Sequence, residues 1–529
     1  MKKKYKVKII KKKIIYEKNP LKIFNQICRL KKNTLLLESS KTKNKKKIES
    51  IIIVDSAIRI TLKKSIIYIK YFSKNGKNLI NRFVKCLSKN IKFKKKKNVF
   101  KIFFLKENKF ISLDEDKRLK ETSFLKIFKI IINNFDYPKK NPQSIFFGGL
   151  FSYDFIKYYE NSIKFKKKQK CPDFCFYVAE TMIFFNHKNK KCIIQSTIFK
   201  KNKIEKIRLK KKILKIKKLM VLKNFQKYEK KNVKNISITN NCDKKKFSEL
   251  VKKSKKYIKK GKIFQIVLSR KFFISCYNPL YAYFLLKKSN PSPYMFFMND
   301  EKFTLFGSSP EIFLKYNSKN RKIEIHPIAG TRKRGTFING SINIDLDNKI
   351  ELEMRTNKKE LSEHIMLVDL ARNDLAKICV PGSRYVKYFK KVHKYSHVMH
   401  LVSVVTGKLK KDLDAFHAYY ACMNMGTLTG APKIKAMQII SKLEKEERGV
   451  YGGSIGYFNG SGALNTCIII RSAYIKKNIA TVQSGAGIVL ESIPEEETKE
   501  TWNKACAVLQ SIYLSQKNKN IIIKKFKEK

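Results

Sequence analysis

The amino-acid sequence predicts an α+β fold, in which strands and helices do not follow the regular alternation of a parallel sheet. Runs of β-branched and aromatic residues at 51–54, 66–69 and 99–104 predict strands in the first half of the chain. Helical periodicity becomes clear only after residue 242. The 529 residues, 43% of them hydrophobic, are enough for two domains or for one large two-layer unit.

The most clearly marked helix begins after Asp243, which is a suitable N-cap, and ends at Gly261, which can adopt the left-handed conformation that stops a helix. Its apolar face is predicted to consist of Phe247, Leu250, Val251 and Ile258. The apolar run 263–268 follows directly and predicts a strand.

Two further helices are predicted, one from about 358 to 375 and one that begins near Pro494. The buried stripe of the first is expected to contain Leu361, Ile365 and Val368. The lysine-rich stretch 200–231 is compatible with either a long solvated helix or a linker, and the pattern does not decide between them.

The charge of the chain is extreme, since 119 basic residues stand against 41 acidic ones and give a net charge of +78. Such a balance raises the possibility of a nucleic-acid partner. The excess is nearly all lysine, is spread along the chain, and accompanies abundant Ile and Asn, which have A/T-rich codons. Base-composition drift explains this pattern better than selection for phosphate contacts, so we expect no nucleic-acid partner.

The eleven cysteines show no metal-ligand spacing, which predicts free thiols in a reducing compartment. The basic segment 1–13 is not followed by an apolar run of signal-peptide length. Nowhere do about eighteen apolar residues run together, so no membrane span is expected. We therefore expect a cytoplasmic protein.

Two pairs of glutamates have the spacing of neighbours on one helical face. Glu360 and Glu363 lie three residues apart, as do Glu497 and Glu500. Two such helices facing one another would offer hard oxygen ligands to Mg²⁺, which prefers a few carboxylates together with water and substrate oxygens. The alternative is that these are solvated surface glutamates, which the spacing of a single pair favours. Because acidic residues are scarce in this chain and two such pairs are present, the two interpretations are about equally supported.

Other candidate residues are weaker when taken singly. Gly485–Gly487 would let backbone N–H groups approach a ligand carboxylate, although a tight turn would use the same residues. Arg471, at a strand end, is a candidate carboxylate clamp or a surface residue. His400 and Glu311 lie in apolar surroundings, where a satisfied core side chain is the alternative to a catalyst.

Five longer motifs together resemble the chorismate-utilising enzymes, from about Leu35 to Leu514. They are Ser309–Glu311, Pro327–Arg332, Glu363–Asp374, Gly426–Lys433 and Gln483–Gly487. Within that family the sequence is similar to the bacterial component I group of anthranilate synthases. The resemblance implies large, mostly antiparallel sheets packed as a two-layer core with helices outside.

The resemblance also divides the chain into a part at 1–235 with a tryptophan-sensing segment, a catalytic part at 236–515, and a lysine-rich tail at 516–529 that we expect to be disordered.

Two positions bear on the reaction. Relatives that add water usually carry Lys where this chain has Gln265, and aminodeoxychorismate synthases generally carry a nucleophilic Lys where it has Ala329. Both differences favour direct attack by ammonia.

The resemblance implies a role for each matching residue. Glu363 and Glu500, supported by Glu360 and Glu497, would hold Mg²⁺ against the ring carboxylate of chorismate. Glu311 would protonate the leaving hydroxyl, His400 would act in the elimination of pyruvate, and Thr427 and Gln265 complete the catalytic set. The substrate-binding positions are Gly330, Thr331, Tyr451, Arg471, Gly485, Ala486, Gly487 and Lys504.

A second, regulatory site is implied near Leu35–Ser39, which resembles the tryptophan-sensing segment of the family. The tryptophan-binding positions are Glu38, Ser39, Pro293, Tyr294 and Met295. Ser39 and the main chain of Pro293 and Tyr294 would hold the polar end of the amino acid. The alternative is that 35–37 is simply a core strand.

The expected activity is therefore the conversion of chorismate and ammonia to anthranilate and pyruvate, the first step of tryptophan synthesis. No glutaminase motif is visible, so the ammonia is expected from a glutamine amidotransferase subunit, with two copies of each chain in the assembly. Another chorismate aminase, making aminodeoxychorismate or aminodeoxyisochorismate, is the alternative enzyme, and a basic nucleic-acid-binding protein is the alternative of another class. Two departures from the family pattern are Leu268, where relatives often carry Pro, and Cys506, where many carry Arg.

Overall fold

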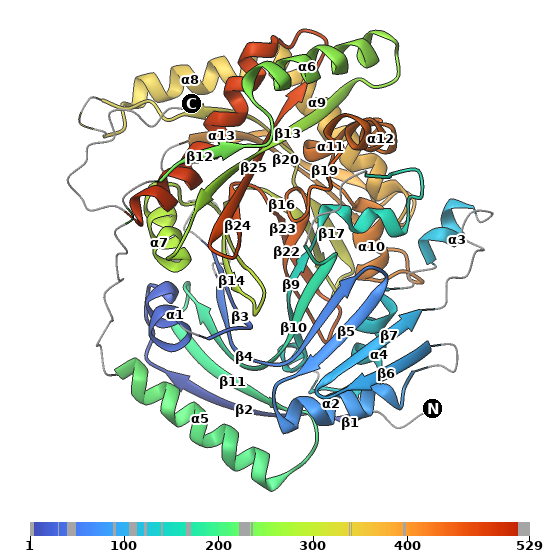
Figure 1. Cartoon of the computed structure of the whole chain (residues 1–529), viewed down its shortest axis with the longest axis vertical. Helices are drawn as coiled ribbons and strands as arrows, with labels where there is room; N and C mark the ends of the chain where they lie inside the picture. The colour runs from blue at the N-terminus through green and yellow to red at the C-terminus, as the bar shows by residue number, and fades with distance from the viewer. Residues whose placement is uncertain are drawn as a thin grey trace.

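Strands from both halves of the chain pair in one large sheet that closes on itself, with the helices on its outer side, as the computed structural model shows (Figure 1). Every pairing in this sheet is antiparallel among the residues that the structure describes. These residues are 5–29, 31–39, 49–87, 91–104, 114–120, 124–138, 141–165, 171–221, 233, 236–337, 339, 341–394 and 398–516. The α+β class and the mostly antiparallel sheet are thus confirmed.

The helices are α1 (Pro20–Cys28), α2 (Lys74–Val84), α3 (Glu115–Lys120), α4 (Lys126–Asn134), α5 (Lys203–Val221), α6 (Lys244–Lys259), α7 (Pro279–Ser289), α8 (Ile344–Thr356), α9 (Lys358–Ala376), α10 (Ala415–Cys422), α11 (Gly426–Thr429), α12 (Lys433–Glu444) and α13 (Pro494–Leu514). The first strands are β1 (Tyr5–Lys6), β2 (Lys8–Ile14), β3 (Thr34–Glu38), β4 (Glu49–Lys63), β5 (Ile66–Tyr71), β6 (Ile91–Lys96), β7 (Val99–Phe104), β8 (Phe135–Asp136), β9 (Phe146–Phe151), β10 (Phe174–Asn186), β11 (Lys191–Ile198) and β12 (Ile238–Asn240). The later strands are β13 (Gln265–Ser275), β14 (Tyr294–Asn299), β15 (Thr304–Ser309), β16 (Ile312–Asn317), β17 (Lys322–Ile325), β18 (Ile328–Lys333), β19 (Tyr385–Lys394), β20 (Val398–Lys408), β21 (Gly430–Ala431), β22 (Ser454–Asn459), β23 (Leu464–Ile468), β24 (Ser472–Lys476) and β25 (Ile479–Ile488).

The signals at the ends of α6 operate as the sequence predicts. The Asp243 carboxylate accepts a hydrogen bond from the Lys246 N–H at 2.8 Å, and Gly261 follows the helix with a φ of +64°. A side-chain cap of this kind satisfies one of the N–H groups that a helix start leaves without a partner. Phe247 and Val251 are buried on the face that packs against the sheet.

The predicted buried stripe of α9 is partly wrong. Ile365 is 47% exposed, whereas Val368 is buried and His364, Leu367 and Leu375 complete the inward face. The helix is rotated by about one residue relative to the expected stripe, because a polar residue, His364, takes an inward position and bonds to Ser403. This rotation leaves Glu360 and Glu363 near the strands of the sheet.

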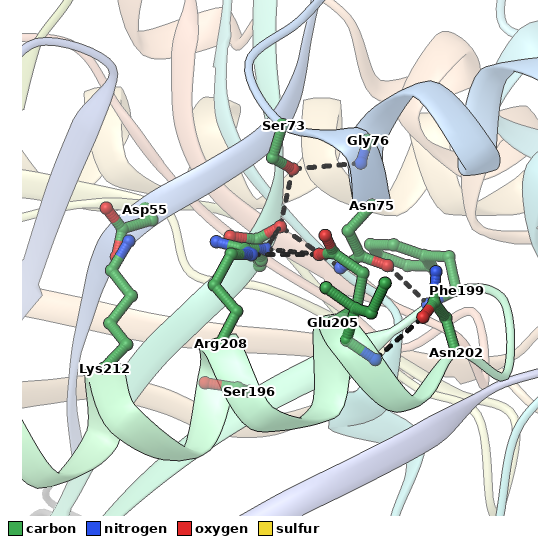
Figure 2. Close-up of polar contacts among 12 residues, drawn as sticks. Asp55, Ser73, Asn75, Gly76, Ser196, Phe199, Asn202, Glu205, Arg208 and Lys212 are labelled. Carbon is green, nitrogen blue, oxygen red and sulfur yellow. Dashed lines mark hydrogen bonds and ion pairs between the residues drawn. The ribbon is translucent and has the colours of Figure 1, made fainter.

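The lysine-rich stretch 200–231 forms a helix at α5, and 222–231 lie outside the described residues. The helix is held by ion pairs as well as by its buried Leu209, Ile213 and Ile216. Lys212 pairs with Asp55 of β4 at 2.7 Å, and Arg208 pairs with Glu205 at 2.7 Å (Figure 2). The helical alternative is therefore confirmed for 203–221.

The two predicted domains share one sheet, and residues of both contribute to the same hydrophobic cluster. Strand β9 pairs with β22, and the rings of Phe147 and Phe458 stack with their centroids 4.4 Å apart. The boundary at 235/236 stays a prediction. In the predicted tail, Gln516 is buried and donates to the Ser275 carbonyl at 2.7 Å, whereas 517–529 lie outside the described residues.

Two further expectations concern cysteines and membrane spans. The structure describes all eleven cysteines, and each is a free thiol, as predicted. Within the described ranges, no helix has the length and apolar character needed to cross a bilayer.

Candidate active site

Most of the predicted catalytic and substrate-binding residues lie around β13 and β25, which α9, α11 and α13 approach in the upper half of Figure 1. The two strands are antiparallel partners, with Val267 opposite Gly487 and Ser269 opposite Gly485. The ends of β18 and β20 complete the surroundings of the site. Residues more than 200 positions apart in the sequence are thereby brought together.

Glu311 is a buried carboxyl group, 4% exposed, in the segment between β15 and β16. Burial raises its pKa to about 8, although the hydrogen bond from Thr427 and the positive charge of Lys504 act in the opposite direction. Thr427 Oγ1 donates to Glu311 Oε1 at 2.9 Å. Glu311 is therefore protonated at neutral pH and can serve as an acid.

Gln265 and Glu363 are in direct contact. Gln265 Nε2 donates to Glu363 Oε1 at 2.9 Å, and Gln265 is 2% exposed. Its other amide atom, Oε1, is buried and accepts no hydrogen bond from any residue that the structure describes. A Cβ atom at position 487 would lie 3.0 Å from Gln265 Nε2 and 3.4 Å from Glu363 Oε1, so glycine lets this contact lie close against β25.

Glu360 lies in the first turn of α9, where Asn357 caps its N–H. Its Oε1 pairs with Arg332 at 2.5 Å, and its Oε2 is buried without a hydrogen-bond partner in the described part of the chain. Gly330 has a φ of +64°, and a Cβ atom there would lie 3.2 Å from Glu360 Oε2. A buried carboxylate oxygen next to a glycine is a suitable position for a ligand.

The second glutamate pair lies on α13. Glu497 is buried and accepts a hydrogen bond from Ser492 at 2.6 Å. Glu500 is half-buried and forms an ion pair with Lys504, which also donates to the Gly485 carbonyl at 3.1 Å. In the described ranges, no three His, Cys, Asp or Glu side chains are gathered closely enough to form a metal site on their own.

His400 lies next to Gly330, and Arg471 lies close enough to His400 for its charge to act on the imidazole. His400 is buried, and its Nδ1 lies 3.4 Å from the Gly330 carbonyl oxygen. Burial, together with the charge of Arg471, lowers the pKa of His400 to about 4, so the imidazole is neutral at pH 7. Desolvation also lowers the pKa of Arg471, which has no carboxylate partner among the described side chains. A partly buried guanidinium of this kind can bind an anionic ligand.

The remaining substrate-binding positions border this region. Tyr451 is buried, and a Cβ atom at position 485 would lie 2.9 Å from its hydroxyl oxygen and 2.6 Å from the Leu268 carbonyl oxygen. Ala486 is buried opposite Leu268. The backbone of Thr331 pairs with His400 across β18 and β20.

The predicted tryptophan-binding residues lie together elsewhere, where β3 pairs with β14 and Glu38 is opposite Met295. Glu38 is buried and accepts hydrogen bonds from Tyr283 at 2.7 Å and Lys287 at 2.6 Å. Ser39 Oγ donates to the Pro293 carbonyl at 3.4 Å, and the Tyr294 hydroxyl donates to Asn465 at 3.4 Å. The two segments thus meet, and tryptophan binding stays a prediction.

Arg332, Glu444 and Arg448 were not identified from the sequence as site residues. Arg332 pairs with Glu360, and Glu444 and Arg448 form a buried ion pair behind β13. The spacing of four residues between Glu444 and Arg448 was an available signal, but Glu444 ends α12 and Arg448 lies in the loop after it, so the spacing did not show that the two side chains meet. Of the two departures, Leu268 is fully buried on β13 and Cys506 is half-buried on α13.

Comparison with known proteins places these residues in a family. A family model described as chorismate binding enzyme matches residues 88–510. Anthranilate synthase component 1 of Buchnera aphidicola subsp. Pemphigus spyrothecae is 53% identical over 98% of this chain and 99% of its own length. Component I of anthranilate synthase from Streptococcus pneumoniae TIGR4 is 26% identical, with a TM-score of 0.66 over 89% of this chain and 95% of that one.

The menaquinone-specific isochorismate synthase MenF of Escherichia coli has the same fold. Its TM-score is 0.67 over 96% of this chain and 94% of that one, at 16% sequence identity. The family model and the 53% identical relative both extend over most of the length of the chain. The chain therefore belongs to the chorismate binding enzyme family.

Proposed function

We propose that the chain is the large subunit of an anthranilate synthase, which converts chorismate and ammonia to anthranilate, pyruvate and water as the first step of tryptophan synthesis. The relative that is 53% identical carries the name anthranilate synthase component 1. The site supports this reaction because it offers an acid, a neutral imidazole, and a buried amide in place of a lysine at position 265.

The observation that carries the proposal is the orientation of Gln265. Because its Nε2 donates to Glu363, its buried Oε1 remains a hydrogen-bond acceptor with no partner among the described residues. An acceptor of this kind can hold and orient ammonia, whose N–H groups donate, but a neutral amide cannot remove a proton from water as a lysine amine can. Ammonia is thus favoured over water as the nucleophile.

The substrate is a dicarboxylic acid, and two basic groups are available to bind it. Arg471 has no carboxylate partner within the described residues, and Lys504, which pairs with Glu500, also donates to the Gly485 carbonyl. The glycines at 485 and 487 allow Tyr451, Gln265 and Glu363 to lie close against β25. We therefore assign Arg471 to one carboxylate and the Gly485–Gly487 segment with Lys504 to the other.

The carboxylate chemistry on α9 and α13 suits magnesium, although in the described ranges no three such side chains are gathered into one cluster. The candidate ligands are carboxylate oxygens, which Mg²⁺ prefers, and Glu360 Oε2 is a buried oxygen without a hydrogen-bond partner in the described chain. Glu363 and Glu500 would hold the ion, with Glu360 and Glu497 in support. When bound, it would neutralise the ring carboxylate next to the carbon that ammonia attacks.

The protein side chains then carry the proton transfers. As ammonia forms a bond to the ring carbon, the ring hydroxyl leaves with a proton from Glu311 as water, with Thr427 holding the carboxyl group in place. His400 is neutral and can accept the ring proton when the enolpyruvyl group leaves as pyruvate. The sum is one chorismate and one ammonia giving one anthranilate, one pyruvate and one water.

The proposal extends to partners and regulation. A glutamine amidotransferase subunit would supply ammonia, with two copies of each chain in a heterotetramer. Tryptophan would inhibit by binding between Ser39 and the Pro293–Met295 segment, where the two segments already meet. We also propose a cytoplasmic location, with which the free thiols agree.

The test is to incubate the purified chain with chorismate, Mg²⁺ and ammonium at raised pH and to identify the products by fluorescence and mass. Anthranilate together with an equal amount of pyruvate is the expected result. An aminated product that retains the enolpyruvyl group would instead identify another chorismate aminase. Salt-sensitive DNA binding without chorismate turnover would overturn the enzymatic proposal.

A further inference from the structure

A buried ion pair, Arg448 with Glu444, lies behind the site. Arg448 Nε and Nη2 donate to the two oxygens of the Glu444 carboxylate at 2.9 Å and 2.7 Å, and Arg448 is 2% exposed. Removing two charges from water is expensive unless all their hydrogen bonds are made. The other hydrogen bonds of Arg448 and Glu444 therefore indicate the role of this buried pair.

The guanidinium joins two segments that carry site residues. Arg448 Nη1 donates to the Leu428 carbonyl at 2.6 Å, and Nη2 donates to the Val267 carbonyl at 2.7 Å. Leu428 follows Thr427, which bonds to the acid Glu311, and Val267 lies two residues after Gln265 on β13. The planar guanidinium of Arg448 therefore bridges the backbone next to Thr427 and the backbone near Gln265.

The carboxylate of the pair reaches the strand that borders the substrate. Glu444 Oε1 accepts hydrogen bonds from the Ser269 N–H at 2.8 Å and from the Ser269 hydroxyl at 2.9 Å. Ser269 lies opposite Gly485 and also accepts a hydrogen bond from Gln483 Nε2 at 2.8 Å. The ion pair is therefore continuous with β25.

The loop that carries Arg448 is itself anchored. The Arg448 and Gly449 N–H groups donate to the Asp154 carboxylate at 3.0 Å and 2.6 Å, and the guanidinium lies 5.8 Å from the centre of the Tyr451 ring. The position of the cation is thus set from outside the segments that it joins. Because the guanidinium group is planar and rigid, its position can fix the positions of the Leu428 and Val267 carbonyl groups that accept its hydrogen bonds.

We infer that Arg448 and Glu444 are positioning residues that set the spacing between the Thr427–Glu311 acid and the Gln265–Glu363 contact, so that both act on one bound substrate. The inference rests on the proposed function. Arg448 contacts the site segments through their backbone, so its effect is on geometry. A misplacement of about 1 Å in such a site lowers the rate about a hundredfold.

The experiment compares R448K and E444Q with a control at a second buried bidentate pair. Arg59 donates to Asp300 at 2.7 Å and 2.9 Å and lies outside the site, so R59K removes the same kind of fork. Each purified variant is assayed with ammonium for kcat and for the KM of chorismate, and its thermal midpoint is measured. R448K keeps the charge but cannot reproduce the fork.

We expect R448K and E444Q to lower kcat by about tenfold to a hundredfold while the KM of chorismate changes less than about threefold. R59K should lower the thermal midpoint but leave kcat per folded molecule unchanged. Loss of kcat in R448K no larger than in R59K, or an effect confined to KM, would overturn the inference.

If R448K and E444Q do not fold, S269A decides by the same comparison, because it removes a single hydroxyl that bonds to Glu444. Wild-type protein that makes no anthranilate would refute the proposed function and is recognised before any variant is compared. Active wild type with unaffected variants would refute the positioning role alone.

Discussion

Thr427 donates its hydroxyl hydrogen bond to Glu311 across 2.9 Å, and the acceptor is a carboxyl group removed from water. The bond favours the ionised form of Glu311, whereas burial favours the neutral form and prevails, so the pKa is about 8. This balance determines how the rate should depend on pH.

The pH profile should show a loss of activity at alkaline pH. Glu311 donates its proton only while it is protonated, so kcat/KM for chorismate, measured at a fixed concentration of free ammonia, should fall as pH rises through about 8. E311Q should not show this decrease at alkaline pH. Its kcat/KM should also be lower than that of the wild type by a factor of about 10²–10⁴. An unchanged alkaline limb in E311Q would assign it to another group.

Removing the hydroxyl of Thr427 should move the same limb. In T427V the ionised carboxylate loses a donor, so the pKa of Glu311 rises and the limb shifts to higher pH. The matched control is T429V on the same short helix, where the hydroxyl bonds to the Met425 carbonyl. A shift in both variants would contradict the specific contact.

Gln265 should be needed for ammonia but not for folding. Q265L keeps the size of the side chain and removes both amide groups, leaving Glu363 Oε1 without this donor. Loss of about 1–3 kcal/mol, or roughly fivefold to 150-fold in kcat/KM for ammonia, is expected. Q195L, at a buried glutamine away from the site, serves as the folding control. Equal losses in the two variants would argue against a role of Gln265 in ammonia use.

Magnesium dependence should require Glu500. E500Q keeps the shape but removes the negative charge, so Mg²⁺-dependent turnover should be abolished and calorimetric Mg²⁺ binding weakened. E496Q, on the exposed face of the same helix, should behave as the wild type. Near-normal turnover by E500Q would remove Glu500 from the ligand set.

Tryptophan should lower the initial rate and raise the thermal midpoint. A ligand that binds only the folded state at a hundred times its Kd stabilises that state by about 2.7 kcal/mol. S39A should weaken both effects, since Ser39 lies at the junction with Pro293. Phenylalanine is the matched control ligand. A flat rate at saturating tryptophan would show that this chain has lost the predicted feedback.

Local signals in the sequence were reliable where they acted through neighbouring atoms. The Asp243 cap and the Gly261 stop fix the ends of α6 within one turn, because their effects depend on the backbone beside them. The buried face of α9 was less predictable. Ile365 is exposed because His364 takes the inward position and bonds to Ser403, which lies on a distant strand.

By itself, the sequence determined the fold class and the helices that carry the two glutamate pairs. It also showed the family resemblance from which the candidate residues were identified. Only the tertiary structure decided that Gln265 contacts Glu363, that Glu311 is buried beside Thr427, and that Arg448 joins the segments between them. These relationships depend on strand register and on removal from water. Both properties arise when segments distant in the chain pack together, so no local pattern could reveal them.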